Sequence, residues 1–108
     1  MSFRVHGCVV EAESGRPLAG MLVRLYDKDV VLDDFLGESR SGPDGRFELS
    51  FGEAQFRDVF EKRPDLYLRV YDPSGSQLLR STEHEVRFDA GRDEFFEVRI
   101  DRTGVRES

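Results

Sequence analysis

Acidic side chains crowd one short stretch of the chain, and they are the residues best suited to chemistry. Four fall within a span of eight residues and a fifth ends a later apolar run: Asp27, Asp29, Asp33, Asp34 and Asp72. Calcium takes about six to eight oxygen ligands, which loop carboxylates and main-chain carbonyls supply. The five carboxylates are therefore a candidate calcium site, and calcium is the one cofactor that the sequence suggests. The alternative is that they cap turns in a solvated loop, because Lys28 lies among them and Asp is a common turn residue.

The two histidines and the single cysteine offer little to catalysis. His6 and Cys8 are two residues apart, so on a strand they share a face, as the members of a Cys–His dyad would. The sequence identifies no third group to orient the histidine, and we interpret Cys8 as a small buried or half-buried filler. His6 and His84 are interpreted as polar residues on outward strand faces, with His84 at the start of a short strand. We therefore assign no catalytic residue.

A second candidate surface combines aromatic and basic side chains. Alternation along two apolar runs places five of them on outward strand faces: Arg24, Tyr26, Tyr67, Arg69 and Tyr71. Tyr and Arg are over-represented at recognition surfaces, so this face is the candidate binding surface for a protein or an extended ligand. The alternative is an ordinary sheet surface in which Tyr and Arg pack across strands.

The elements that must position these residues have a period of two. Apolar residues alternate with polar ones in four runs: Val23 and Leu25; Phe47, Leu49 and Phe51; Leu66, Leu68 and Val70; Phe96, Val98 and Ile100. We expect eight of them to be buried: Phe47, Leu49, Phe51, Leu68, Val70, Phe96, Val98 and Ile100. Turn signals such as the Gly-Pro-Asp-Gly of residues 42–45 separate the runs. This pattern predicts one all-β domain over residues 1–108, an antiparallel two-sheet β-sandwich of seven or eight strands.

One segment departs from that period. Within residues 53–63, Phe56, Val59 and Phe60 follow the i, i+3, i+4 spacing of a helix, and Pro64 then stops it. We expect one short helix there, lying across the end of the sandwich. The tail, residues 102–108, is expected to fray.

The order of these runs and turns resembles a known group of domains. The matching segments are Gly7-x-Val9-Val10, the turn Ser14–Gly20, the strand Val23–Asp27, Asp44-Gly45-Arg46-Phe47 and the strand Pro64–Asp72. They are similar to transthyretin-like, or carboxypeptidase regulatory-like (prealbumin-like), β-sandwich domains. The resemblance runs from residue 5 to residue 72 and implies the transthyretin fold. It implies no single function, because such sandwiches carry unrelated activities.

An enzyme with this fold, hydroxyisourate hydrolase, provides the catalytic alternative. Its members carry a histidine shortly before the first turn, further His and Arg residues, and a C-terminal Tyr-Arg-Gly-Ser. Here His6 lies nine residues before Gly15, Cys8 occupies the place where the histidine is wanted, and the chain ends without the tetrapeptide. We therefore favour a non-catalytic binding or assembly module. A calcium-binding module is the first alternative and a related hydrolase the second.

Self-association is a further expectation about partners. In the run Glu94–Ile100, alternation leaves Phe95 on the outer face of a strand near the C-terminus. An edge strand there would present unpaired N–H and C=O groups to another chain. A weak homodimer through this edge and a monomer with a solitary surface aromatic are both consistent with the sequence.

Charge and composition argue against other partners. The net charge of −6 disfavours nucleic acid and anionic membrane surfaces. No apolar stretch approaches the roughly 20 residues that span a bilayer, so we expect no membrane insertion. The single cysteine forms no intrachain disulfide, and the first strand begins without a signal peptide before it. We expect a cytoplasmic protein, unless the chain is excised from a larger one.

Overall fold

The computed structural model describes residues 2–52 and 64–101. They form seven strands and a short 3-10 turn: β1 (Ser2–Glu11), β2 (Leu22–Asp27), β3 (Asp34–Arg40), β4 (Arg46–Gly52), β5 (Leu66–Tyr71), β6 (Leu78–Ser81), η2 (Glu83–Glu85) and β7 (Asp93–Ile100). The helix expected within residues 53–63 and the tail 102–108 lie outside the described residues. Among the described residues, no helix is long and apolar enough to cross a membrane.

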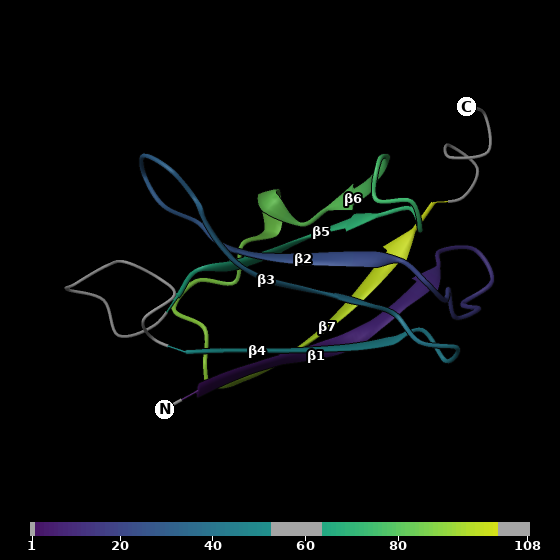
Figure 1. The fold of residues 1–108 in the computed structure, drawn as a ribbon, viewed down its shortest axis with the longest axis horizontal. Helices are drawn as coiled ribbons and strands as arrows, with labels where there is room; N and C mark the ends of the chain where they lie inside the picture. Colours follow the sequence, from purple (N-terminus) through teal and green to yellow (C-terminus); the bar gives the residue numbers. More distant parts are fainter. Residues whose placement is uncertain (1, 53–63, 102–108) are drawn as a thin grey trace.

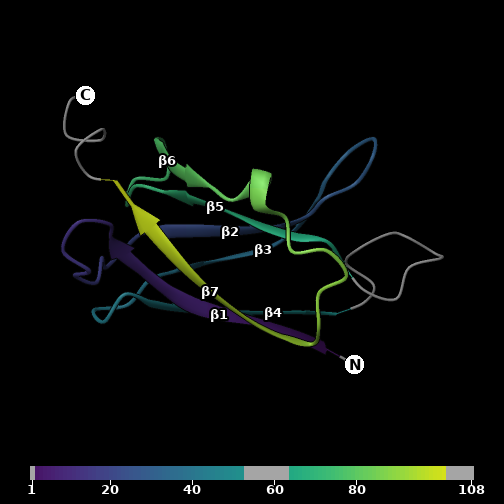
Figure 2. The same ribbon diagram turned by 180° about the vertical axis from the view of Figure 1, so that it is seen from behind.

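The strands form two sheets that pack face to face as a β-sandwich (Figure 1). The three-stranded sheet has the order β4-β1-β7 and the four-stranded sheet the order β3-β2-β5-β6. The expected sandwich is therefore present, but β1 and β7 run parallel where uniform antiparallel pairing was predicted. A parallel pair needs a crossover connection. Here the chain leaves the four-stranded sheet through β6 and η2 and crosses to the other sheet before β7 begins (Figure 2).

The core lies between the sheets and follows the period-two alternation. Along β4, buried and exposed residues alternate without interruption. Phe3 of β1 stacks on Phe51 of β4 with 5.1 Å between ring centroids. The apolar members of the four predicted runs are all buried: Val23, Leu25, Phe47, Leu49, Phe51, Leu66, Leu68, Val70, Phe96, Val98 and Ile100. The prediction of the core is therefore confirmed.

Gly7 determines how closely β1 and β7 approach each other. It lies opposite Phe96 in the strand register, and a Cβ atom placed on Gly7 would lie 1.8 Å from the Phe96 carbonyl oxygen. That oxygen belongs to the main chain of the neighbouring strand, so it moves only if the strand moves. Glycine is required here by the close approach of β7.

Gly7→Ala is expected to destabilise the fold by about 3 kcal/mol or more, because β7 must move away from β1. Gly42→Ala is the control, since its Cβ would meet the Asp44 side chain at 3.4 Å, an ordinary contact. Urea unfolding of both variants measures the difference. Equal losses of stability would contradict the close approach.

Candidate functional site

The acidic residues stand at opposite ends of the four-stranded sheet. Asp27 lies opposite Leu66, whereas Leu22, at the other end of β2, lies opposite Tyr71. Asp72 follows Tyr71, where its Oδ1 accepts hydrogen bonds from main-chain N–H groups of the turn after it. The predicted grouping of Asp72 with the other four carboxylates is therefore wrong, because the length of β5 separates them.

Asp27 is a buried carboxylate at the end of β2. It is 6% exposed, and its Oδ1 accepts a hydrogen bond of 2.9 Å from the Asp65 N–H. Burial is the main cause that raises the pKa of Asp27 to about 6. The charges of Asp65, Asp34 and Asp29 act in the same direction, and the hydrogen bond from the Asp65 N–H acts against them. Repulsion among the carboxylates therefore exists at this end of the sheet, and Asp27 experiences it.

The loop between β2 and β3 uses its own carboxylates as hydrogen-bond acceptors. Asp33 accepts from the Asp29 N–H at 2.9 Å through Oδ1 and from the Tyr67 hydroxyl through Oδ2. Asp29 accepts from the Val30 N–H at 2.6 Å. Burial alone would raise the pKa of Asp33. The hydrogen bonds from the Asp29 N–H and the Tyr67 hydroxyl, together with the charges of Lys28 and Arg69, outweigh burial and hold this pKa below its ordinary value. The hydrogen bonds close the base of the loop.

The described carboxylates at this end of the sheet do not form a ligand set for a metal ion. Within residues 2–52 and 64–101, no three His, Cys, Asp or Glu side chains come together as ligands for one metal ion. Asp27, Asp29 and Asp33 instead accept hydrogen bonds from within the chain. The geometry supports the turn-capping alternative, and calcium binding stays a prediction.

Tyr67 does not belong to an exposed recognition face as predicted, because it is only 1% exposed. Its ring stacks on Tyr26 with 5.3 Å between centroids and 15° between planes. The charged groups of Lys28 and Arg69 lie 5.9 and 5.7 Å from its ring centre. Glu83 of η2 binds both cations, at 3.0 and 3.2 Å. These side chains cover Tyr67 from the outside, which the strand alternation alone does not reveal.

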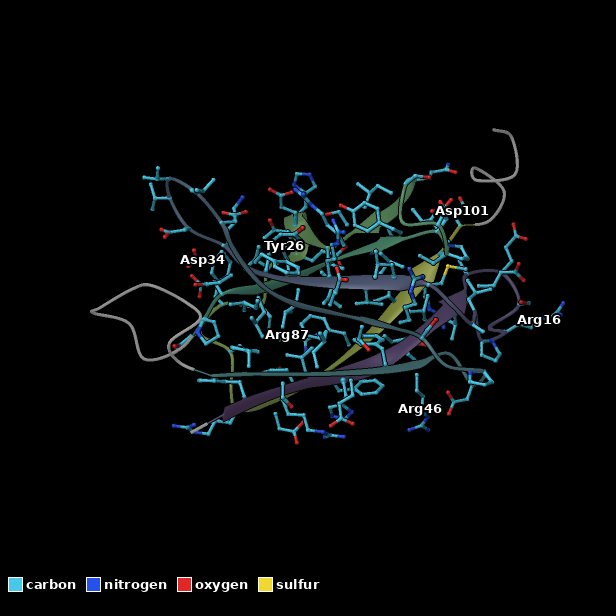
Figure 3. The ribbon with its side chains drawn as sticks, in the orientation of Figure 1. Arg16, Tyr26, Asp34, Arg46, Arg87 and Asp101 are labelled. Atoms are coloured by element: carbon cyan, nitrogen blue, oxygen red, sulfur yellow. The ribbon has the colours of Figure 1, made fainter. Side chains whose placement is uncertain are left out.

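The remaining members of the predicted surface are half-buried and paired within the sheet. Arg24 Nε donates to Glu38 at 3.0 Å, and the Arg24 guanidinium lies 5.2 Å from the centre of the Tyr71 ring. Tyr26 lies on the side of β2 that faces away from the other sheet (Figure 3), with Phe35 of β3 5.7 Å from it between ring centroids. This arrangement matches the cross-strand packing alternative.

A polar cluster occupies the outer face of the three-stranded sheet. His6 Nε2 lies 2.9 Å from Asp93 Oδ1, and Arg4 Nη1 donates to the same carboxylate at 3.1 Å. Asp93 is thus the orienting group that the sequence did not identify, because 87 residues separate it from His6. Cys8 is half-buried two positions further along β1. Since the Asp93 side chain is 60% exposed, the pair is solvated, unlike the water-excluded groups of most catalytic sites.

Two further predictions concern single residues. Phe95 is 50% exposed on β7, and β7 is an edge strand, so both parts of that prediction are confirmed. His84 lies in η2 and does not start a strand. The reason is local, because β6 ends at Ser81 and the Glu85 N–H then donates to the Thr82 carbonyl at 2.8 Å to close a turn.

The tip of the β2–β3 loop carries the most exposed large apolar side chains among the described residues. Val30, Val31 and Leu32 are 97%, 92% and 77% exposed, and Phe35 at the start of β3 is 52% exposed. In Figure 1 this loop rises away from the sandwich beyond the ends of β2 and β3. Sequence reasoning missed this feature. Three successive apolar residues among carboxylates were a signal, but their position in a polar loop does not reveal their exposure.

Comparison with known proteins informs the fold alone. No protein-family model matches the sequence, and no curated protein matches it. Among solved structures, the chain is similar to part of a 9R-lipoxygenase from Cyanothece PCC8801, with a TM-score of 0.58 and 22% identity. The match covers 92% of this chain and 17% of the lipoxygenase chain. The two share a fold. The chain spans less than a fifth of that enzyme, whose activity therefore says nothing about this chain.

Asp27 should make stability depend on pH in the direction opposite to that of most carboxylates. Folding raises its pKa from 3.8 to about 6. Between these two pH values, Asp27 is therefore protonated more often in the folded state than in the unfolded state. The stabilisation from protonated Asp27 is fully present below the lower value and is lost as the pH rises through the upper one. Asp27→Asn should therefore reduce stability most near pH 4, and this loss should shrink by up to about 3 kcal/mol toward pH 7.

Urea unfolding of the wild type and variant across this pH range measures the effect. Asp72→Asn is the control with the opposite sign, because the Ser74 hydroxyl and the following N–H groups lower the pKa of Asp72. Its loss of stability should grow as the pH rises. A loss from Asp27→Asn that does not vary with pH would contradict the raised pKa.

Proposed function

We propose that this chain is a non-catalytic binding module that recognises a protein partner through the tip of the β2–β3 loop, residues Val30, Val31 and Leu32. The proposal rests on the 77–97% exposure of these three successive apolar side chains. Single exposed apolar residues are normal on a monomer. A contiguous exposed apolar patch marks an interaction site. The loop tip therefore supplies a hydrophobic anchor.

Burial of this tip would contribute part of the binding energy of a transient complex. Each Val or Leu side chain gains about 1.5–3 kcal/mol on complete burial, so three supply about 5–9 kcal/mol before the costs of association. A micromolar complex corresponds to about 8 kcal/mol. Phe35, which packs against Tyr26 at the base of the loop, adds an exposed aromatic surface next to the tip.

The charges around the tip favour a partner cleft with a basic rim. Asp29 and Asp33 flank the three apolar residues, and Asp34 follows. Lys28, the cation of this segment, is paired with Glu83 at 3.0 Å. Complementary potentials steer association and select partners. An apolar cleft surrounded by Lys or Arg side chains therefore fits this loop best.

The base of the loop is ordered by hydrogen bonds that do not require a partner. The Lys28 N–H donates to the Asp65 carbonyl at 2.7 Å, and Asp33 holds both the Asp29 N–H and the Tyr67 hydroxyl. An interface that is ordered in advance loses less conformational entropy on binding. The tip is thus presented on a fixed support.

Other features support a binding role and its setting. Polar side chains on each outer face pair within their own sheet, as in the Arg24–Glu38 and His6–Asp93 pairs. The two-sheet sandwich, with a tight turn at residues 42–45 before β4, supports the proposed relationship to transthyretin-like domains. A single cysteine is compatible with the cytoplasm, the compartment that we propose.

Photo-crosslinking from the loop tip in cells of the source organism tests the proposal. A photoreactive residue at position 31 should give one recurrent protein adduct, whereas the same residue at Arg16, at the end of the molecule away from Asp34 (Figure 3), should not. Val30→Ser with Leu32→Ser should abolish the adduct. Stability should change by no more than about 0.5 kcal/mol, because both side chains are exposed.

Leu78→Ser is the matched control, because it removes a different exposed apolar side chain, one that is 48% exposed on β6. This variant should retain the adduct. Persistence of the same adduct after both tip substitutions, or equal labelling from position 16, would contradict the proposal.

A further inference from the structure

The outer edge of β7 is a second surface able to take a partner. β7 is the last strand of the three-stranded sheet, and among the described residues no strand pairs with its outer side. On the inner side, Arg4 and Ala12 donate to the carbonyls of Arg92 and Ile100. The direction of the main-chain groups alternates along a strand. The odd-numbered residues between Arg92 and Ile100 therefore point their N–H and C=O groups outward. An edge of this kind is a template for another strand.

Arg87 covers this edge near its centre. Its Nη1 donates to the Phe95 carbonyl at 2.6 Å, one of the outward main-chain acceptors of β7. The same nitrogen binds Glu94 Oε1 at 3.0 Å, and the guanidinium lies 3.9 Å from the centre of the Phe96 ring. Glu94 is itself fixed, because its Oε2 accepts from the Gly91 N–H at 2.6 Å. A side chain held by three contacts thus occupies the position that an added strand would take.

We propose that the outer edge of β7 is a strand-addition surface for β7 of a second copy of this chain, and that Arg87 closes it. The partner is a second copy because the charges along the outer face of β7 are self-complementary. Asp93 and Arg99 lie three positions on either side of Phe96, and both are exposed. An antiparallel pair with its two-fold axis at Phe96 therefore places each Asp93 opposite Arg99 of the second copy.

Neighbouring registers are disfavoured by like charges. With the axis at Phe95, Asp93 would face Glu97 of the second copy, and with the axis at Glu97 the two Glu97 side chains would face each other. In the register centred on Phe96, the Phe95 carbonyl accepts from the Glu97 N–H of the second copy. That carbonyl is the one that Arg87 occupies, so the preferred register and the closed edge exclude each other.

The contacts that these charges already make do not conflict with that register. Asp93 binds Arg4 and His6 on the outer face, with its side chain 60% exposed. Arg99 donates to the Ala12 carbonyl at 3.2 Å and lies 3.6 Å from Glu97, with 52% of its side chain exposed. Both side chains therefore remain more than half exposed beside the position of a partner strand. This surface belongs to the three-stranded sheet, so its test is independent of the β2–β3 loop.

Sedimentation equilibrium of Arg87→Met over a concentration series tests the proposal. Methionine keeps an apolar stem beside Phe96 and removes the donor to the Phe95 carbonyl. We expect a monomeric wild type and a dimeric variant, with association tightened about ten-fold or more. Arg80→Met is the matched control, because Arg80 has a similarly exposed side chain, 37% against 39%, and pairs with Glu85 instead of a residue of β7. It should remain monomeric.

Charge reversal then tests the register in the Arg87→Met background. Arg99→Glu should weaken the dimer, because the carboxylate at position 99 of each copy would then lie opposite Asp93 of the other copy. Asp93→Arg combined with Arg99→Glu should restore the dimer, with thermal melting to verify that each variant is folded. A monomeric Arg87→Met protein, a wild type that dimerises as tightly as this variant, or a dimer that ignores the charge reversal would overturn the proposal.

Discussion

The buried hydroxyl of Tyr67 is the constraint on which the outer face and the β2–β3 loop depend. A phenol with 1% exposure needs a hydrogen-bond partner inside the protein, and Asp33 provides it. Burial, together with that bond, raises the pKa of Tyr67 above its ordinary range, so the hydroxyl remains a donor. Asp33 in turn holds the Asp29 N–H, and these bonds fix the base of the loop. The three apolar residues beyond that base point into solvent as a consequence.

Period-two alternation was sufficient to predict the core, because inward and outward side chains of a strand differ by one position. It was insufficient where a covering element or a distant register decides the outcome. Tyr67 and Tyr71 both face outward from β5, but η2 and its ion pairs lie over Tyr67, which is buried while Tyr71 is half-buried. Asp93 reaches His6 only through the pairing of β1 with β7. The turn role of Asp72 likewise follows from the strand end at which it stands.

The two proposed surfaces illustrate opposite ways of managing exposed groups. The loop tip leaves apolar side chains open to water, which disfavours the isolated state and favours a complex. The edge of β7 instead has an outward carbonyl occupied by Arg87, so that pairing with another strand first requires the loss of a charge-assisted hydrogen bond. Charges contribute to the specificity of both surfaces, because carboxylates flank the loop tip and complementary charges flank Phe96. A protein with a net charge of −6 can thus remain dispersed and still carry a specific contact.

Amide hydrogen exchange of Tyr67→Phe is the most direct test of the constraint that supports the binding loop. The variant removes the hydroxyl that holds Asp33 and keeps the ring that stacks on Tyr26. We predict faster exchange in the β2–β3 loop, including the Asp29 N–H, with exchange in β1, β4 and β7 unchanged. Tyr26→Phe, which removes a hydroxyl from the same face without touching the Asp33 bond, should leave the loop protected. Unchanged loop exchange in Tyr67→Phe, or equal acceleration in both variants, would contradict a loop held by Tyr67.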